Sequence, residues 1–184
     1  MRGLPWCVLS YRLPSEPSRL RLAVWRRLKR LGAVVLHDAV WLLPADPAPR
    51  EALEWLAQEI EQQGGTAFTW EAQSLDGPQD QAIVDRFRAD ADARYAAIAE
   101  SASELSRVAT RVRPDRQAQL QQIRRRLVGL ERAFRLERRR DHFGAPGRKE
   151  AERAVRGALA EADARLPAAA NSADRPRTRR AVGH

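Results

Sequence analysis

The 184-residue sequence has little of what marks a disulfide-rich, zinc-binding or membrane-spanning protein. Its single cysteine, Cys7, cannot form an internal disulfide, and the three histidines are too scattered to predict a zinc site beside it. No segment approaches the roughly 18 consecutive apolar residues of a membrane helix, and Pro14 and Pro17 interrupt the N-terminus before a signal-like stretch develops. We expect a cytoplasmic protein without a membrane segment or a bound metal.

Catalytic motifs are also absent. The sequence contains no glycine-rich phosphate loop, GxSxG, HExxH or CxxC, and Cys7 falls in a predicted strand with no evident histidine partner. Glutamates at 51, 54, 59 and 61 form an acidic helix face, a pattern more typical of solubilising charge than of a catalytic pair. We therefore expect a protein that is not an enzyme and has no cofactor.

Lysine is scarce, since only Lys29 and Lys149 occur among 33 basic residues. Coding bias towards arginine explains most of this ratio, although the planar guanidinium also suits phosphate. The net charge of +9 is unevenly distributed, with −2 over residues 1–110 and +11 over residues 111–184. This asymmetry is the stronger indication of a polyanionic partner.

The first 76 residues predict a ferredoxin-like α+β domain. Short runs rich in β-formers at 6–12, 33–37, 40–44 and 66–73 predict four strands, and helices are expected over 18–31 and 49–63. The order βαββαβ gives a four-stranded antiparallel sheet covered on one face by two helices. In the hairpin between the second and third strands, Ala39 occupies the place where we expect glycine at a left-handed position.

All five tryptophans, at 6, 25, 41, 55 and 70, fall in this domain. They could form a platform on which nucleic-acid bases stack. Because no predicted element contains more than one tryptophan, core packing is the favoured interpretation, since large aromatic side chains supply much buried area to a small domain.

The remainder predicts a helical appendage over residues 77–166 and a disordered basic tail over 167–184. Apolar residues recur every three or four positions from Val84 to Leu105 and again from Leu120 to Phe134, which predicts a long antiparallel helical hairpin bent near Pro114. A further C-terminal helix is expected over about 148–165. Because two helices leave apolar surface uncovered, the hairpin should also dock on the sheet domain or on a second subunit, which favours a homodimer.

Basic clusters supply the candidate nucleic-acid-binding residues. The first helix presents five cations without an intervening acid, and direct phosphate contact competes with the alternative of an ordinary solvated face. A second cluster lies in the helical hairpin. The candidates are Arg19, Arg26, Arg27, Lys29 and Arg30, followed by Arg124, Arg125 and Arg126.

Arg21 lies in the first turn of the first helix, where a cation opposes the helix dipole. We expect a negative group near it. An internal carboxylate is the favoured partner, and the alternative is an oxyanion held by Arg12, Ser15, Ser18 and Arg21 with the free amides of the helix start.

Several strings resemble the N-terminal domain of the chromate resistance protein ChrB, over about residues 6–165. The most specific are YRLPSEPS, WRRLKRLGA and HDAVWLLP, with weaker similarity in REALEWLAQEIEQQGGTAF, FRADADARY and RRRDHFGAPGRKEAERAV. The resemblance implies a transcription regulator of chromate-efflux operons that binds promoter DNA. The sheet domain is also similar to the module of the phenylacetate-pathway repressor and of a small CRISPR-associated nuclease. Arg12 stands where that nuclease has an aspartate, which argues against metal-dependent cleavage.

The resemblance implies a DNA-binding regulatory module, with promoter DNA as its partner. Family members carry a second, chromate-response domain that we expect this chain to lack, so a separately encoded sensing domain is a possible partner. Two alternatives remain open, namely a protein-interaction module that pairs with such a sensor domain and a small nuclease or oxyanion-handling enzyme.

Overall fold

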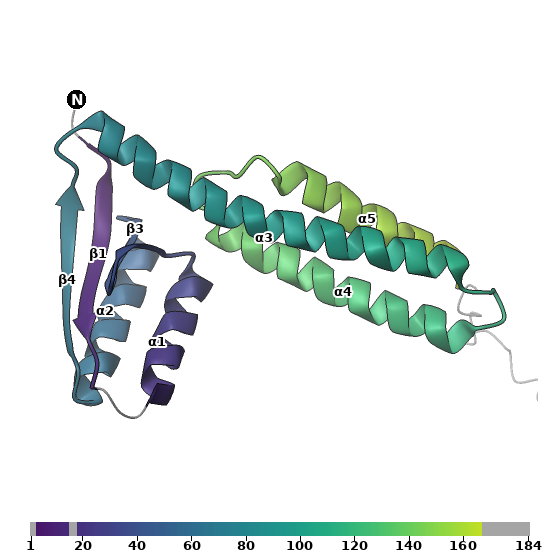
Figure 1. The fold of residues 1–184 in the computed structure, drawn as a ribbon, viewed down its shortest axis with the longest axis horizontal. Helices are drawn as coiled ribbons and strands as arrows, with labels where there is room; N and C mark the ends of the chain where they lie inside the picture. The colour runs from purple at the N-terminus through teal and green to yellow at the C-terminus, as the bar shows by residue number, and fades with distance from the viewer. Residues whose placement is uncertain (1–2, 15–17, 167–184) are drawn as a thin grey trace, which may run out of the picture.

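The computed structural model describes residues 3–14 and 18–166, which form one sheet and five helices (Figure 1). The elements in chain order are β1 (Pro5–Arg12), α1 (Ser18–Leu31), β2 (Val34–His37), β3 (Val40–Pro44), α2 (Pro47–Gln62), β4 (Thr66–Gln73), α3 (Gly77–Arg111), α4 (Gln117–Arg140) and α5 (Arg148–Ala164). This order confirms the expected α+β fold. The expected basic tail, 167–184, lies outside the described residues.

The four strands form an antiparallel sheet in the order β2-β3-β1-β4. β1 is central, with Val8 opposite Leu42 of β3 on one side and Trp70 of β4 on the other. This is the order of a ferredoxin-like domain, and α1 and α2 cover one face of the sheet as expected (Figure 1).

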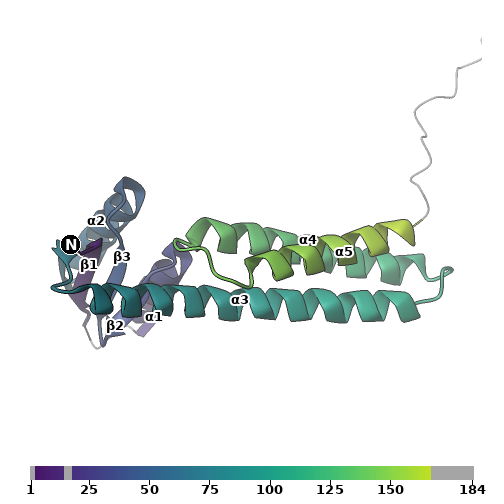
Figure 2. The ribbon, with the colours of Figure 1, turned by 90° about the horizontal axis from the view of Figure 1, so that it is seen from above.

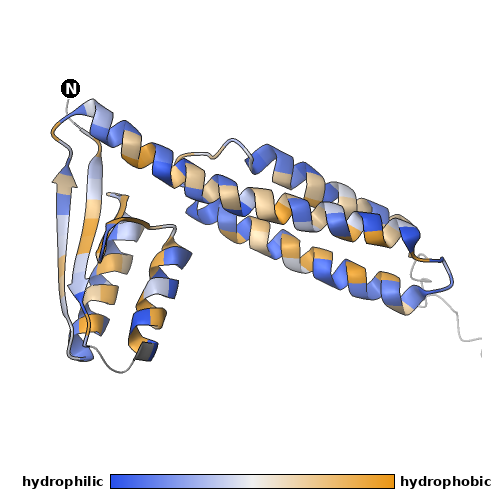
Figure 3. Cartoon of the chain, in the orientation of Figure 1, coloured by the Kyte–Doolittle hydropathy of each residue, from blue (hydrophilic) through white to orange (hydrophobic). Residues whose placement is uncertain are grey.

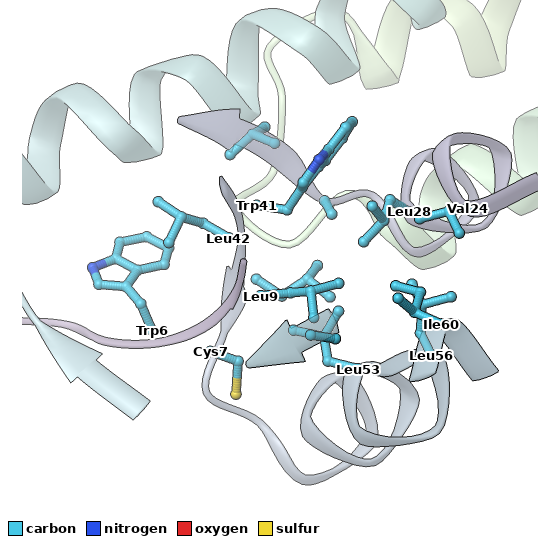
Figure 4. Close-up of a cluster of buried hydrophobic side chains, with 14 of the residues drawn as sticks. Trp6, Cys7, Leu9, Val24, Leu28, Trp41, Leu42, Leu53, Leu56 and Ile60 are labelled. Atoms are coloured by element: carbon cyan, nitrogen blue, oxygen red, sulfur yellow. The ribbon is translucent and has the colours of Figure 1, made fainter. Parts of the chain in front are cut away.

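Side chains alternate between the two faces of the sheet. Cys7 and Leu9 point towards the face covered by α1 and α2, where they meet Leu28, Leu53 and Ile60 in a continuous core (Figure 4). The alternate residue Trp6 points to the opposite face and stacks on Phe87 of α3, with ring centroids 5.8 Å apart. The sheet therefore has apolar contacts on both faces.

Two turn residues have left-handed backbone conformations. Gly32 ends α1 with φ +76°, and Ala33 N donates a hydrogen bond to Leu28 O, as the stop signal in the sequence predicts. In the β2–β3 hairpin the left-handed residue is Asp38, with φ 44°. The expectation that Ala39 occupies a glycine position was wrong, because the turn uses the preceding aspartate, which tolerates this conformation.

The tryptophan interpretation was wrong for three residues of five. Trp6 and Trp41 are buried, whereas Trp25, Trp55 and Trp70 are 46%, 59% and 51% exposed. The space between the helices and the sheet is filled by aliphatic side chains, namely Leu20, Val24, Leu28, Leu53, Leu56 and Ile60. The core on this side of the sheet therefore does not need Trp25 or Trp55.

The helices α3, α4 and α5 form a three-helix bundle, with α3 running out from the sheet, α4 returning and α5 running out again (Figures 1 and 2). Gly147 N at the start of α5 donates to Asp92 Oδ1 of α3 (2.6 Å), and Arg165 Nη2 just after it donates to Val112 O (2.7 Å). Apolar bands of the three helices face one another (Figure 3). α5 covers the apolar seam between α3 and α4. The seam is therefore not free to pair with a second subunit, and it gives no support to dimerisation.

The long helix α3 takes part in both cores. Val84 and Phe87 belong to the core of the sheet, and Ala91, Tyr95 and later residues belong to the bundle. The domain boundary expected between residues 76 and 77 stays a prediction, and packing continues across it. No helix in the described part of the chain is both long and apolar enough to cross a membrane.

Asp80 joins the first turn of α3 to the start of β1. Its carboxylate accepts hydrogen bonds from Leu4 N (2.7 Å) and Trp6 Nε1 (2.8 Å). Hydrogen bonds from the side chains of Ser74 and Trp6, and from the backbone of Leu4, lower the pKa of Asp80.

Since the pKa of Asp80 is lower in the folded chain than in the unfolded one, this carboxylate stabilises the fold above its unfolded pKa, near 4, and the stabilisation is lost as the pH falls through the folded pKa. We expect Asp80→Asn to flatten the decline of unfolding free energy with acid. Urea titrations from neutral pH downwards, followed by tryptophan fluorescence, test this. Parallel acid profiles for the variant and the parent protein would contradict it.

Candidate nucleic-acid interface

The helix α1 presents its cations on the side opposite the sheet. Leu20, Val24 and Leu28 are buried, and the acid-free helix places Arg19, Arg26 and Arg30 on the exposed side. Positions i, i+7 and i+11 of a helix fall within about 40° of one another, so these three form one stripe about 16 Å long. Within the described residues, none of the three has an ion-pair partner.

The other two candidates of α1 are engaged inside the protein. Arg27 Nη1 pairs with Glu59 Oε2 of α2 at 2.6 Å, and Lys29 Nζ pairs with Asp90 Oδ2 of α3 at 2.9 Å. Lys29 also lies 5.7 Å from the centre of the Trp41 ring. The sequence predicted the same role for all five cations of α1. In the structure three of them form an outward stripe, and the other two, Arg27 and Lys29, pair with α2 and α3.

The second cluster does not adjoin the first. Arg140 Nη1 at the end of α4 donates to Lys29 O at 3.1 Å, whereas Arg124, Arg125 and Arg126 lie about 20 Å farther along α4. Arg124 pairs with Asp163 of α5 at 2.5 Å, and Arg126 lines a groove that also contains Glu100 and Glu104. Arg125 is exposed and, within the described chain, has no ion-pair partner.

Two further arginines continue the basic surface, of which Arg132 was missed from the sequence. Arg132 and Arg139 follow Arg125 at seven-residue spacing, and all three are exposed on the side of α4 opposite its buried Leu127 and Phe134. We call this set the α4 ridge. The heptad spacing is visible in the sequence, whereas the predicted cluster Arg124, Arg125 and Arg126 consists of consecutive residues, which point in different directions on a helix.

The expected oxyanion cluster is not assembled from the described side chains. Ser15 and the Ser18 side chain lie outside the described part of the chain. Tyr11 faces the helices, and strand alternation turns Arg12 towards the other face of the sheet. Arg21 is exposed, and no carboxylate among the described residues forms an ion pair with it. Burial raises the pKa of Tyr11, and the charge of Arg21 opposes this shift.

A cavity of about 220 Å³ lies beside Cys7, between α2 and β4. Arg50 is the basic residue that lines this cavity, but its guanidinium pairs with Glu71. A second carboxylate, Glu54, also lines the cavity. Burial raises the pKa of the Cys7 thiol, more than Arg50 lowers it. The thiol is therefore protonated at neutral pH, which makes it a weak nucleophile. No cluster of histidine, cysteine or carboxylate suited to a metal occurs in residues 3–14 and 18–166.

A buried carboxylate fixes α4 against α3 and, through its neighbours, against α1. Glu137 is fully buried and accepts hydrogen bonds from Arg94 Nε (2.8 Å) and Arg140 Nε (2.6 Å). Arg94 also reaches Asp90 (3.6 Å), which binds Lys29. We call these five residues the Glu137 network. It holds α1 at a fixed position relative to the bundle, and with it the relative position of the two basic helices.

Comparison with known proteins gives a family model and a curated relative. Residues 21–167 match the family model described as "Protein ChrB, N-terminal". The chain is 34% identical over 84 residues to "Protein ChrB" of Cupriavidus metallidurans, a match that covers 44% of this chain and 26% of that protein. No solved structure matches the chain. Because the family model spans most of the sequence, including α1 from Arg21 onwards, α4 and α5, the chain belongs to the ChrB N-terminal family.

Proposed function

We propose that this chain, from a family related to chromate resistance, is a DNA-binding module of a transcription regulator. Its partner is promoter DNA, and it acts in the cytoplasm without a cofactor or enzymatic activity. The observation that most supports this proposal is the exposed stripe of Arg19, Arg26 and Arg30 on a helix without acidic residues. The α4 ridge extends the cationic surface.

Exposed guanidinium groups without carboxylate partners favour contact with the DNA backbone. Binding then releases the counterions condensed on the phosphates, and no internal ion pair has to be broken first. Arg27 and Lys29 are already paired, so we assign them a structural role. The contact residues become Arg19, Arg26, Arg30, Arg125, Arg132 and Arg139, which is enough to neutralise about six phosphates.

The salt dependence of binding tests this surface. With about six neutralised phosphates, the slope of log affinity against log salt should be near −5. We expect Arg26→Ala with Arg30→Ala to reduce its magnitude by about 1.8, because two contacts are lost. Fluorescence anisotropy on a duplex from the chain's own upstream region measures both slopes.

The matched control is Arg107→Ala with Arg156→Ala, which removes the same charge from two exposed arginines paired with Glu104 and Glu152. These residues lie on α3 and α5 beside α4, but they belong to neither the α1 stripe nor the α4 ridge. Because each is already paired with a glutamate, the slope should stay near the parent value. Equal slopes for the two double variants would refute the assignment of Arg26 and Arg30.

A homodimer is part of this proposal, now supported only by the two-fold symmetry of most repressor sites. The alternative is an interaction module that pairs with a separately encoded chromate-sensing domain and does not bind DNA. Adding chromate, with sulfate as control, to the anisotropy assay distinguishes sensing by this chain from sensing elsewhere. The protonated, buried Cys7 thiol weighs against an oxyanion-reducing enzyme.

A further inference from the structure

Two exposed aromatic side chains form a stacked pair on the edge strand β4. Phe68 and Trp70 are 61% and 51% exposed, and their rings stack with centroids 5.8 Å apart at an interplanar angle of 16°. The two rings contact each other, and more than half of each residue is open to solvent. Their exposed sides offer flat apolar surface on which another ring can stack.

The pair lies on the face of the sheet that α1 and α2 do not cover. Phe68 is opposite Ser10 and Trp70 is opposite Val8, and these β1 residues alternate with Cys7 and Leu9, which face the helices. The helix α3 crosses this face near Trp6, which packs on Phe87. The part of the face that carries Phe68 and Trp70 remains open.

The size of the patch separates two kinds of occupant. A fully exposed aromatic side chain has about 150–250 Å² of surface, so two rings exposed by about half offer about 200–250 Å². A stable protein interface needs about 800 Å² from each partner. The two rings alone supply about a quarter of that area, whereas their surface suits one or two nucleobases.

The charge around the pair also favours a nucleotide. Arg12 is exposed at the end of β1, opposite Thr66, so its side chain lies on the same face as Phe68 two positions along β4. The β1 and β4 positions that alternate onto this face, from Trp6 to Arg12 and from Thr66 to Ala72, include no carboxylate. The nearest acid of β4, Glu71, is turned to the other face, where it pairs with Arg50.

We propose that this open face binds unpaired nucleotides of a single-stranded nucleic acid. Bases stack on the exposed sides of Phe68 and Trp70, and Arg12 contacts the adjacent phosphate. Stacking on aromatic side chains is tolerant of base identity, since every base has a π-face. The site is separate from the stripe of α1, which lies across the sheet, and its operation does not depend on duplex binding.

The test measures binding of fluorescein-labelled oligothymidine and oligouridine by anisotropy at low salt. Phe68→Ala with Trp70→Ala should raise the dissociation constant about 10- to 100-fold, because both stacking surfaces are removed. Trp70→Phe keeps a ring and should retain most of the affinity. Comparison of the two oligonucleotides shows whether the bound chain is DNA or RNA. The upstream duplex should bind the double variant as it binds the parent protein.

The control is Trp55→Ala, which removes an equally exposed tryptophan from α2 on the other side of the sheet. It should leave single-strand affinity unchanged. Three results would overturn the proposal: no oligonucleotide binding by the parent protein, equal losses in the Trp55 and Phe68/Trp70 variants, or a self-association in sedimentation that the double variant abolishes. Circular dichroism checks that the variants fold. Failure of the parent protein to bind duplex DNA would count against the α1 stripe and not against the single-strand site.

Discussion

Glu137→Ala is expected to lower the free energy of unfolding by about 3–5 kcal/mol, since the change removes one side of a buried ion pair. The carboxylate is fully buried, and Arg94 and Arg140 would both lose their acceptor in a protein interior. The loss comes mainly from leaving the partly buried Arg140 without a counter-charge and Arg94 with only its longer contact to Asp90. Urea unfolding followed by circular dichroism measures it.

Glu131→Ala is the control on the same helix. Glu131 pairs with Arg135 at 2.5 Å, but both side chains are in contact with solvent, so the loss should be less than about 1 kcal/mol. Glu137→Gln keeps the volume and removes the charge, which separates packing from electrostatics. A loss at Glu137 no larger than that at Glu131 would show that the network does not hold α4 in place.

Gly32→Ala is expected to destabilise the protein by about 2–5 kcal/mol, from a left-handed backbone and overpacking together. Gly32 has φ +76°, and a Cβ there would lie 2.4 Å from the carbonyl oxygen of Arg140. Because that atom is backbone, α1 and α4 must move apart to admit the methyl group. The unfolding free energy is measured in urea as for Glu137.

Gly129→Ala is the opposite case. Gly129 lies inside α4, and nothing lies within 4 Å of a Cβ added there. Alanine should therefore stabilise the helix by about 1 kcal/mol. Gly32→Ala should lower the free energy of unfolding and Gly129→Ala should raise it. The pair therefore separates the effect of close backbone packing from the effect of helix propensity. If both variants lose stability equally, the contact between Gly32 and Arg140 is not a determinant of the fold.

Much of the fold was predictable because local patterns and tertiary packing agree. The run of β-formers in 66–73 and the glycine stop at Gly32 each mark one element, and the apolar spacing from Val84 to Leu105 specifies both a helix and its buried face. The sequence did not show that α5 covers the hairpin. Its small buried residues, Ala151, Ala158 and Ala162, form a face that only a close-packed partner identifies.

The candidate site was less predictable, because it depends on which cations are paired. Arg26 and Arg27 are adjacent in sequence, yet one is exposed and the other is bound to Glu59, 32 residues away. Lys29 meets Asp90 across 61 residues. The burial of the tryptophans was equally hard to predict, because a strand residue such as Trp70 is buried only if another element covers its face of the sheet. The functions proposed for these residues stay predictions.

The shared helix α3 has a mechanical consequence. Its 35 residues form a rod about 52 Å long, held at one end by the sheet through Phe87 and extending about 36 Å beyond that point to Arg111. The Glu137 network and the contact between Gly32 and Arg140 also hold the bundle against α1, so the sheet and the bundle turn together. A rotation of about 10° about Phe87 therefore displaces the distal end of α3 by about 6 Å, which makes α3 a lever arm for the orientation of the sheet.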